Sequence, residues 1–119
     1  MAKTITLLGE PKSTQSIYKA RVLGRFASMY MTDEGKNIKQ SYRIQTLNQW
    51  KQKTINTLLK LEIHLYFGTK RKCDIDNFNK LVLDSLTGIV YADDSQIWEL
   101  KLEKHYDKEN PRVTVTICD

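Results

Sequence analysis

The sequence predicts an α+β fold, with residues 1–119 forming a single small domain in which two main helices pack against a mixed β-sheet. Segments of alternating hydrophobicity and segments with helical spacing follow one another along the chain, which is the pattern of such folds. At 119 residues the chain is long enough for one hydrophobic core but not for two. Two prolines and five glycines favour short connections between the elements.

The first half of the chain predicts a strand and then a long helix. The apolar, β-branched run 4–8 (TITLL) predicts the opening strand, whereas residues 18–30 are compatible with short strands or with an ordered basic loop. Thr32 followed by Asp33 and Glu34 predicts the start of a helix that runs to about residue 53. We expect its thin apolar stripe to be Ile38, Tyr42, Leu47 and Trp50. We expect its exposed face to carry Lys36, Lys39, Arg43, Lys51 and Lys53.

The second half begins with the clearest element, a strand over 59–67 in which apolar and polar residues alternate. The basic turn 69–72 (TKRK) follows, and residues 76–86 have helical spacing that ends at Gly88. Two closing strands are predicted on either side of the turn 108–111 (KENP), which we expect to form a hairpin. In the first of them the inward residues are Trp98, Leu100 and Leu102. We also expect Trp50 and Trp98 to be packing residues, and His64 and His105 to be surface residues rather than ligands.

The charges divide the sequence into a basic and an acidic segment. Residues 11–72 contain 13 Lys and Arg against 3 Asp and Glu, whereas residues 73–119 contain 5 against 10. This distribution predicts a surface for a polyanion beside a site that needs negative charge, although solvated helix faces would produce the same excess. No apolar run is long enough to cross a membrane. Two isolated cysteines and no secretory signal predict free thiols and a cytoplasmic location.

Four aspartates form the candidate site. Asp74 and Asp76 bracket one residue, so their carboxylates project to the same side of an extended backbone, and Lys80 lies one helical turn beyond Asp76. The pair Asp93 and Asp94 follows in a turn. Gathered carboxylates repel one another unless a cation offsets their charge, and oxygen ligands favour the hard ions Mg²⁺ and Mn²⁺. The pattern therefore predicts a metal site that acts on a phosphodiester.

Each acidic residue also has a purely structural interpretation. Asp74 or Asp76 would cap the following helix, and Asp93 would belong to an ordinary Asx turn. Asp84 would be a solvated helix residue paired with Lys80. These alternatives remain open in the sequence, and the combination of the acids with the neighbouring basic turn favours the hydrolytic site.

The same residues resemble the RusA family of Holliday junction resolvases. The resemblance lies in D-I-D-N at 74–77, Lys80, L-D-S-L at 83–86, D-D-S-Q-I at 93–97 and Lys104. It implies a RusA-like fold and a homodimer that binds four-way DNA junctions and makes paired Mg²⁺-dependent nicks during recombination and repair. It also implies that Asp74, Asp76 and Asp94 are catalytic with Lys80 as the basic partner, and that the metal ligands are Asp74, Asp76, Asp93 and Asp94. Mn²⁺ is the expected substitute for Mg²⁺.

Candidate DNA-binding residues come from three places in the chain. Lys19, Arg21 and Arg25 interleave with aromatic residues, a composition that suits DNA contact, although an amphipathic strand looks the same. The full set that we assign is Lys19, Arg21, Arg25, Lys70, Arg71, Lys72 and Lys104.

Two other functions compete with the nuclease. One is a non-catalytic nucleic-acid-binding module that uses the basic segment 11–72, and the other is a phosphotransferase with an aspartyl nucleophile. The basic turn 70–72, which separates the buried strand from Asp74, disfavours the second.

Overall fold

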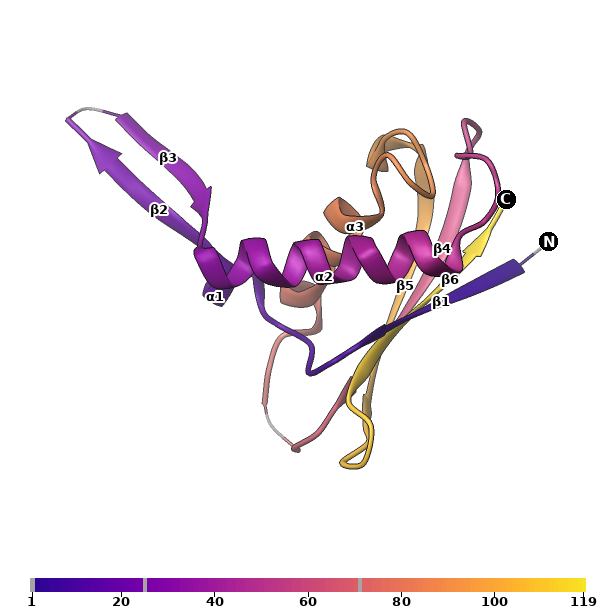
Figure 1. The fold of residues 1–119 in the computed structure, drawn as a ribbon. Coiled ribbons are helices and arrows are strands. Elements are labelled where there is room, and N and C mark those ends of the chain that lie inside the picture. The colour runs from indigo at the N-terminus through magenta and orange to yellow at the C-terminus, as the bar shows by residue number, and fades with distance from the viewer. Residues whose placement is uncertain (1, 25, 71) are drawn as a thin grey trace.

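The computed structural model describes residues 2–24, 26–70 and 72–119. A four-stranded mixed sheet forms its centre, with the strands in the order β1 (Ala2–Leu8), β6 (Arg112–Cys118), β4 (Leu59–Phe67) and β5 (Ile97–Tyr106) (Figure 1). β6 pairs antiparallel with both β1 and β4, whereas β4 and β5 are parallel. The predicted α+β fold with a mixed sheet is therefore confirmed.

The remaining elements lie between these strands in the chain. They are α1 (Thr14–Ile17), β2 (Tyr18–Leu23), β3 (Phe26–Met31), α2 (Asp33–Gln49), the 3-10 turn η1 (Ile75–Phe78), α3 (Asn79–Leu86) and the 3-10 turn η2 (Asp94–Gln96). β2 and β3 pair into a hairpin that projects from the rest of the molecule (Figure 1). Residues 18–23 and 26–30, whose structure the sequence left open, thus belong to a two-stranded arm. None of the helices in the described ranges is both long and apolar enough to cross a bilayer.

One face of the sheet is covered by the helices and the other is open. In β4 every second side chain from Leu59 to Phe67 is buried, and the buried residues of β6 belong to the same core. The alternate side chains, from Lys60 to Tyr66 in β4, lie on the uncovered face and are polar or aromatic. This arrangement follows from the two-residue period of a strand, because one register places all the apolar residues beneath the helices.

α2 begins where its cap residue predicts, since the Thr32 hydroxyl accepts a hydrogen bond from Gly35 N at 3.1 Å. Tyr42 and Trp50 are buried as expected, but Leu47 is exposed, so this part of the predicted stripe is wrong. Arg43 is also not a free surface cation. Its guanidinium donates to the backbone oxygens of Ser85 (3.3 Å) and Thr87 (2.9 Å) and so satisfies carbonyls at the end of α3.

The C-terminal strands differ from the predicted hairpin. β5 and β6 are not neighbours, because β4 lies between them, and the turn 108–111 therefore crosses the end of β4. An ion pair between Arg112 and Asp107 (2.8 Å) holds this crossing, and it keeps the pKa of Asp107 below its ordinary value. The prediction that Trp98 and Leu100 are core residues is also wrong. Leu100, which lies opposite Leu61, is 38% exposed, and Trp98, at the β-bulge where the register shifts, is 73% exposed beside Leu58 and Lys60.

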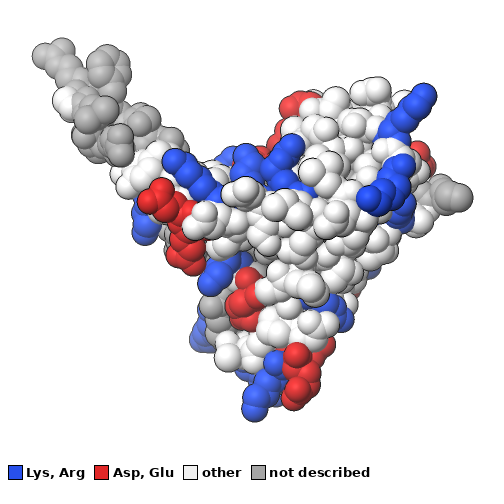
Figure 2. All heavy atoms as spheres, viewed as in Figure 1, with Lys and Arg blue, Asp and Glu red and all other residues white. Residues whose placement is uncertain are grey.

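The two charged segments of the sequence interleave in space. β4 from the basic segment pairs directly with β5 from the acidic segment, and Lys60 contacts Glu99 at 3.2 Å while Lys101 contacts Glu62 at 3.6 Å. On the face that Figure 2 shows, basic and acidic side chains are likewise interspersed. A continuous basic half, as the linear charge distribution predicts, is therefore not what the strand pairing produces.

Candidate active site around α3

Asp74 and Asp76 lie in the segment that leads into α3. Asp74 occupies the N-cap position of η1, yet its side chain makes no capping hydrogen bond, and Asp76 lies in the first turn of η1. Both residues are exposed. The capping interpretation of Asp74 is therefore wrong, because only its backbone oxygen is used, by Asn77 N at 3.1 Å. Two exposed carboxylates that have no side-chain partner among the described residues therefore precede α3.

The second acidic pair divides into one structural and one unpaired residue. The Asp93 carboxylate accepts hydrogen bonds from the hydroxyl and the backbone N–H of Ser95, and these bonds lower the pKa of Asp93. In return Gln96 Oε1 accepts from Asp93 N at 2.8 Å, which completes a capping box. Gln96 also donates to the backbone oxygens of Ile55 and Thr57, both at 2.9 Å. Asp94 is exposed, and its side chain makes no hydrogen bond or ion pair with the described residues.

The buried residue Tyr91, which lies shortly before this turn in the chain, is hydrogen-bonded to α3. Tyr91 donates from its hydroxyl to the backbone oxygen of Leu83 at 2.7 Å. Burial raises the pKa of Tyr91, and the negative charges of Asp94, Asp84 and Asp93 raise it further. The carboxylates of the turn and of the helix therefore act on the same hydroxyl group.

Lys80 pairs with Asp84 rather than with Asp76. Its Nζ lies 3.4 Å from Asp84 Oδ2 and 5.0 Å from the centre of the Tyr18 ring. The Tyr18 hydroxyl donates to the same carboxylate oxygen at 2.7 Å, and burial together with this bond raises the pKa of Tyr18. Asp76 and Lys80 do not share one α-helix, because Asp76 belongs to a 3-10 turn, where the α-helical four-residue spacing does not apply. The alternative pairing with Asp84 is confirmed, but Asp84 is half-buried rather than fully solvated.

Among the candidate DNA-binding residues, Lys104 contacts the segment that carries the first acidic pair. Its Nζ is 3.3 Å from the backbone oxygen of Cys73, which directly precedes Asp74. Lys70 stacks over the ring of Tyr106 at 5.3 Å, and the two lysines share a hollow of about 240 Å³. Lys72 is exposed. The basic turn and the edge strand therefore supply positive charge beside the segment that carries the aspartates.

A further basic candidate, Lys19, lies on the projecting arm. Lys19 is exposed on β2, and its backbone pairs with that of Tyr30 on β3. The side chain of Arg21, as well as Arg25 and Arg71, lies outside the part of the molecule that the structure describes.

The aspartates are not gathered into a preformed ligand cage. Within the described ranges, one group of three His, Cys, Asp or Glu residues has its donor atoms within 4.8 Å of one another, and it is His64, Glu103 and His105 on the open face of the sheet. Asp74, Asp76 and Asp94 instead flank α3 with exposed side chains. Like charges repel one another, which favours a separation of these carboxylates.

Comparison with known proteins shows the family. The chain matches the family described as "Endodeoxyribonuclease RusA" over residues 9–118, nearly its whole length, and it belongs to that family. A relative in Bacillus subtilis (strain 168), "Uncharacterized protein YqaN", is 50% identical over 46 residues, which is 39% of this chain and 32% of the relative. The chain thus matches about a third of the length of that protein. Both residue groups of the acidic motif lie inside the region that matches the family.

Proposed function

We propose that residues 1–119 form a single RusA-like endonuclease domain that resolves four-way DNA junctions by paired nicks during recombination and repair. One observation carries this proposal in a chain of the RusA family. Asp74, Asp76 and Asp94 are exposed carboxylates on both sides of α3, and none of their side chains makes a hydrogen bond or ion pair with a described residue. Unpaired carboxylates beside a phosphate-binding surface favour metal-assisted hydrolysis of a phosphodiester.

The donor set fits a hard divalent ion. Asp74, Asp76 and Asp94 would hold Mg²⁺, with Mn²⁺ as a substitute, because oxygen ligands without imidazole or thiolate suit such ions. A bound ion of this kind supplies charge to the phosphate and lowers the pKa of a water molecule. Asp93 lies close enough to contribute, but its carboxylate already serves the turn. We therefore assign the third ligand to Asp94.

Lys80 supplies the positive charge of the site. Lys80 forms an ion pair with Asp84. The Asp84 side chain is 27% exposed and is oriented by a hydrogen bond from Tyr18. Asp84 and Tyr18 act as positioning residues, since they fix the start of the arm and the lysine on the same side of α3. Lys80 then balances the charge that the phosphate gains during hydrolysis, or positions the attacking water.

Branched DNA is the proposed partner, and the cytoplasm is the proposed location. The phosphate contacts are Lys19, Arg21, Arg25, Lys70, Arg71, Lys72 and Lys104. Lys19 lies on the arm, Lys70 and Lys72 lie on the basic turn, and Lys104 lies on β5. The arm and the basic turn are separate parts of the molecule, and a substrate with several helical arms meets both more readily than one straight duplex does. The thiols of Cys73 and Cys118 are free, which agrees with a reducing compartment.

A four-way junction and a linear duplex of the same sequence, each incubated with and without Mg²⁺, test the function. We expect nicks in the junction only when Mg²⁺ is present, and we expect EDTA to stop the reaction without releasing the bound junction. The products are read on a denaturing gel and the binding on a native gel. Equal cleavage of both substrates would exclude a resolvase while leaving a general nuclease, and junction binding without any cleavage would favour the non-catalytic binding module.

Paired nicks require two active sites, which a two-fold homodimer provides. The surface that best suits a second copy is the edge of the sheet at β5. Trp98 (73% exposed) and Leu58 (56% exposed) line one hollow there, and among the described strands β5 is hydrogen-bonded to β4 alone. Exposed apolar residues next to an unpaired strand edge are features of protein interfaces.

Trp98→Glu is expected to convert the dimer into a monomer, because it places a charge in the centre of this apolar surface. Light scattering coupled to size-exclusion chromatography measures the mass, and the junction assay then shows single nicks in place of paired ones. Leu47→Glu is the matched control, since Leu47 is an exposed apolar residue on α2. A Trp98→Glu protein that remains a dimer would exclude this edge as the interface.

A further inference from the structure

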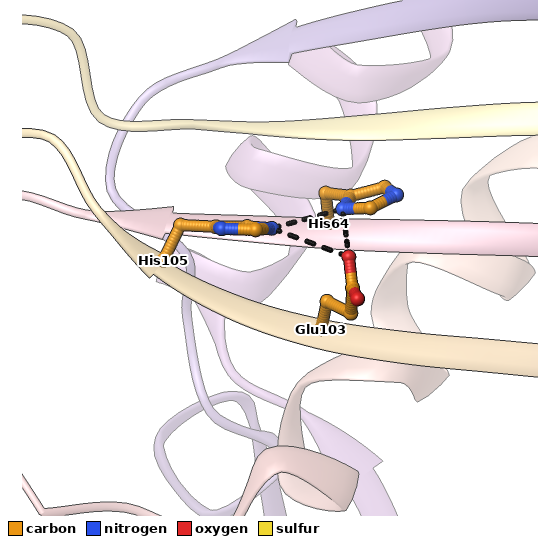
Figure 3. A group of neighbouring side chains, drawn as sticks. All are labelled: His64, Glu103 and His105. Carbon is orange, nitrogen blue, oxygen red and sulfur yellow. Dashed lines mark hydrogen bonds and ion pairs between the residues drawn. The ribbon is translucent and has the colours of Figure 1, made fainter.

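Two histidines and a glutamate converge on the open face of the sheet, on the side away from the helices. His64 comes from β4, and Glu103 and His105 come from β5 (Figure 3). His64 Nδ1 lies 2.9 Å from His105 Nε2 and 2.9 Å from Glu103 Oε2, and His105 Nε2 lies 3.6 Å from the same oxygen. One atom of each side chain therefore points at a common centre.

The strand register produces this convergence. In the parallel pairing of β4 with β5, His64 lies opposite Glu103 and Tyr66 lies opposite His105. Residues two apart in a strand share a face, so all four side chains stand on the open side of the sheet. The side chains are half-buried, and they rest on hydrogen-bonded backbone rather than on a loop. A site on paired strands holds its geometry better than a site on a loop.

Neighbouring groups hold the rings in place. His105 stacks on Tyr66 with ring centres 4.6 Å apart and an interplanar angle of 17°, and Arg112 covers Tyr66 at 3.8 Å. Glu62 Oε1 lies 3.8 Å from Nε2 of His64, the nitrogen that faces away from the cluster. A carboxylate behind the second nitrogen is a common partner of a metal-binding histidine, because it orients the ring.

We propose that His64, Glu103 and His105 form a binding site for a divalent transition-metal ion such as Zn²⁺. Imidazole nitrogens favour Zn²⁺ and its neighbours over Mg²⁺, and three protein ligands leave at least one position for water. A separation of 2.9 Å between the two nitrogens allows both to lie about 2.0–2.1 Å from one ion. This site is distinct from the aspartates, since its donor chemistry differs and no aspartate belongs to it.

The ion would join the edge strand to its neighbour. β5 pairs only with β4, and the three ligands come from these two strands, so a bound ion adds a cross-link that the unfolded chain lacks. Lys104 lies between two of the ligands and points to the opposite face, where it contacts Cys73. Metal binding on the open face therefore stabilises β5, the strand from which Lys104 contacts Cys73 beside Asp74.

One positive charge opposes the ion. Lys101 Nζ lies 3.8 Å from Glu103 Oε1 and 3.6 Å from Glu62 Oε1. Its side chain is 62% exposed and contacts the glutamate oxygen that faces away from the histidines, so it can turn into solvent when an ion binds. Removing this charge should strengthen metal binding, an effect opposite in sign to that of removing a ligand.

Calorimetric titration of the full chain with Zn²⁺ tests the site. We expect the unmodified chain to bind one ion. We expect His64→Asn, Glu103→Gln and His105→Asn each to bind Zn²⁺ at least ~10-fold more weakly. Glu99→Gln is the matched control, because it removes the same charge from the same face of β5 and should leave binding unchanged. Lys101→Gln should bind more tightly, and Asp76→Asn should bind as the unmodified chain does.

The melting temperature gives a second measurement. Zn²⁺ should raise it in the unmodified chain and in Asp76→Asn but not in His105→Asn, because only a folded chain with all three ligands gains from the ion. Absence of Zn²⁺ binding to the unmodified chain would overturn the proposal. So would binding that persists unchanged in all three ligand variants, since the ion would then be held elsewhere.

Discussion

Asp76→Asn is expected to reduce Mg²⁺-dependent cleavage of a four-way junction by at least ~100-fold, while junction binding stays equal or becomes tighter. The substitution removes a charged metal ligand, and it also removes a negative charge that repels the phosphates of the DNA. The Asp76 side chain is exposed and has no partner in the part of the chain that the structure describes, so the fold should not be affected. Gel assays of cleavage and binding, together with the melting temperature, measure the three quantities.

Asp33→Asn is the matched control for this substitution. Asp33 is an exposed aspartate in the first turn of α2, so its replacement removes the same charge at a helix start outside the acidic site. We expect cleavage to be nearly unchanged in this variant, and stability to fall by no more than about 1 kcal/mol through the helix dipole. Full activity in Asp76→Asn would remove Asp76 from the site, and equal loss in both variants would point to a general effect of charge on DNA binding.

Asp94→Asn and Asp93→Ala should have opposite profiles. Asp94 has an exposed carboxylate without a structural contact, so its amide variant should lose at least ~100-fold in cleavage with an unchanged melting temperature. Asp93 caps η2, so its replacement with alanine should lower the melting temperature. Much of the cleavage should remain in Asp93→Ala under conditions where the chain is folded.

Asp93→Asn separates the charge of this residue from its cap. Asparagine caps a helix nearly as well as aspartate does, so this variant should keep both stability and most of the activity. If Asp93→Asn lost activity at unchanged stability while Asp94→Asn remained active, the assignment of the third ligand would be reversed. Comparable losses in both would mean that the two carboxylates share the ion.

Most elements of the fold could be predicted because their residues obey a local period. The strand 59–67 and the helix before Gly88 are such cases. Their apolar residues recur every second residue or along one helix stripe, and this pattern is the same whichever layer of the fold covers them. The predicted hairpin at 108–111 failed for a different reason. Which strands become neighbours depends on pairing across the whole chain. The residues of the turn therefore do not indicate that β4 lies between β5 and β6.

The candidate site divides in the same way. Four carboxylates at the spacings of 74–76 and 93–94 could be recognised from the sequence, as could the pairing of Lys80 with Asp84. The distinction between Asp93 and Asp94 could not, because it depends on which carboxylate turns back onto Ser95. Arg43 was predicted to be a surface cation because residue type alone does not show that α3 ends within reach of its guanidinium.

The sequence by itself determined the fold class, the acidic motif and the resemblance to the RusA family, because local periods and motif spacings are properties of the chain. Only the tertiary structure decided which carboxylates are unpaired and that Trp98 is exposed at an edge. It also brought His64 beside Glu103 and His105, residues about 40 positions apart in the sequence. Such contacts arise from strand order and register, which are set by how the whole core packs and not by any one segment.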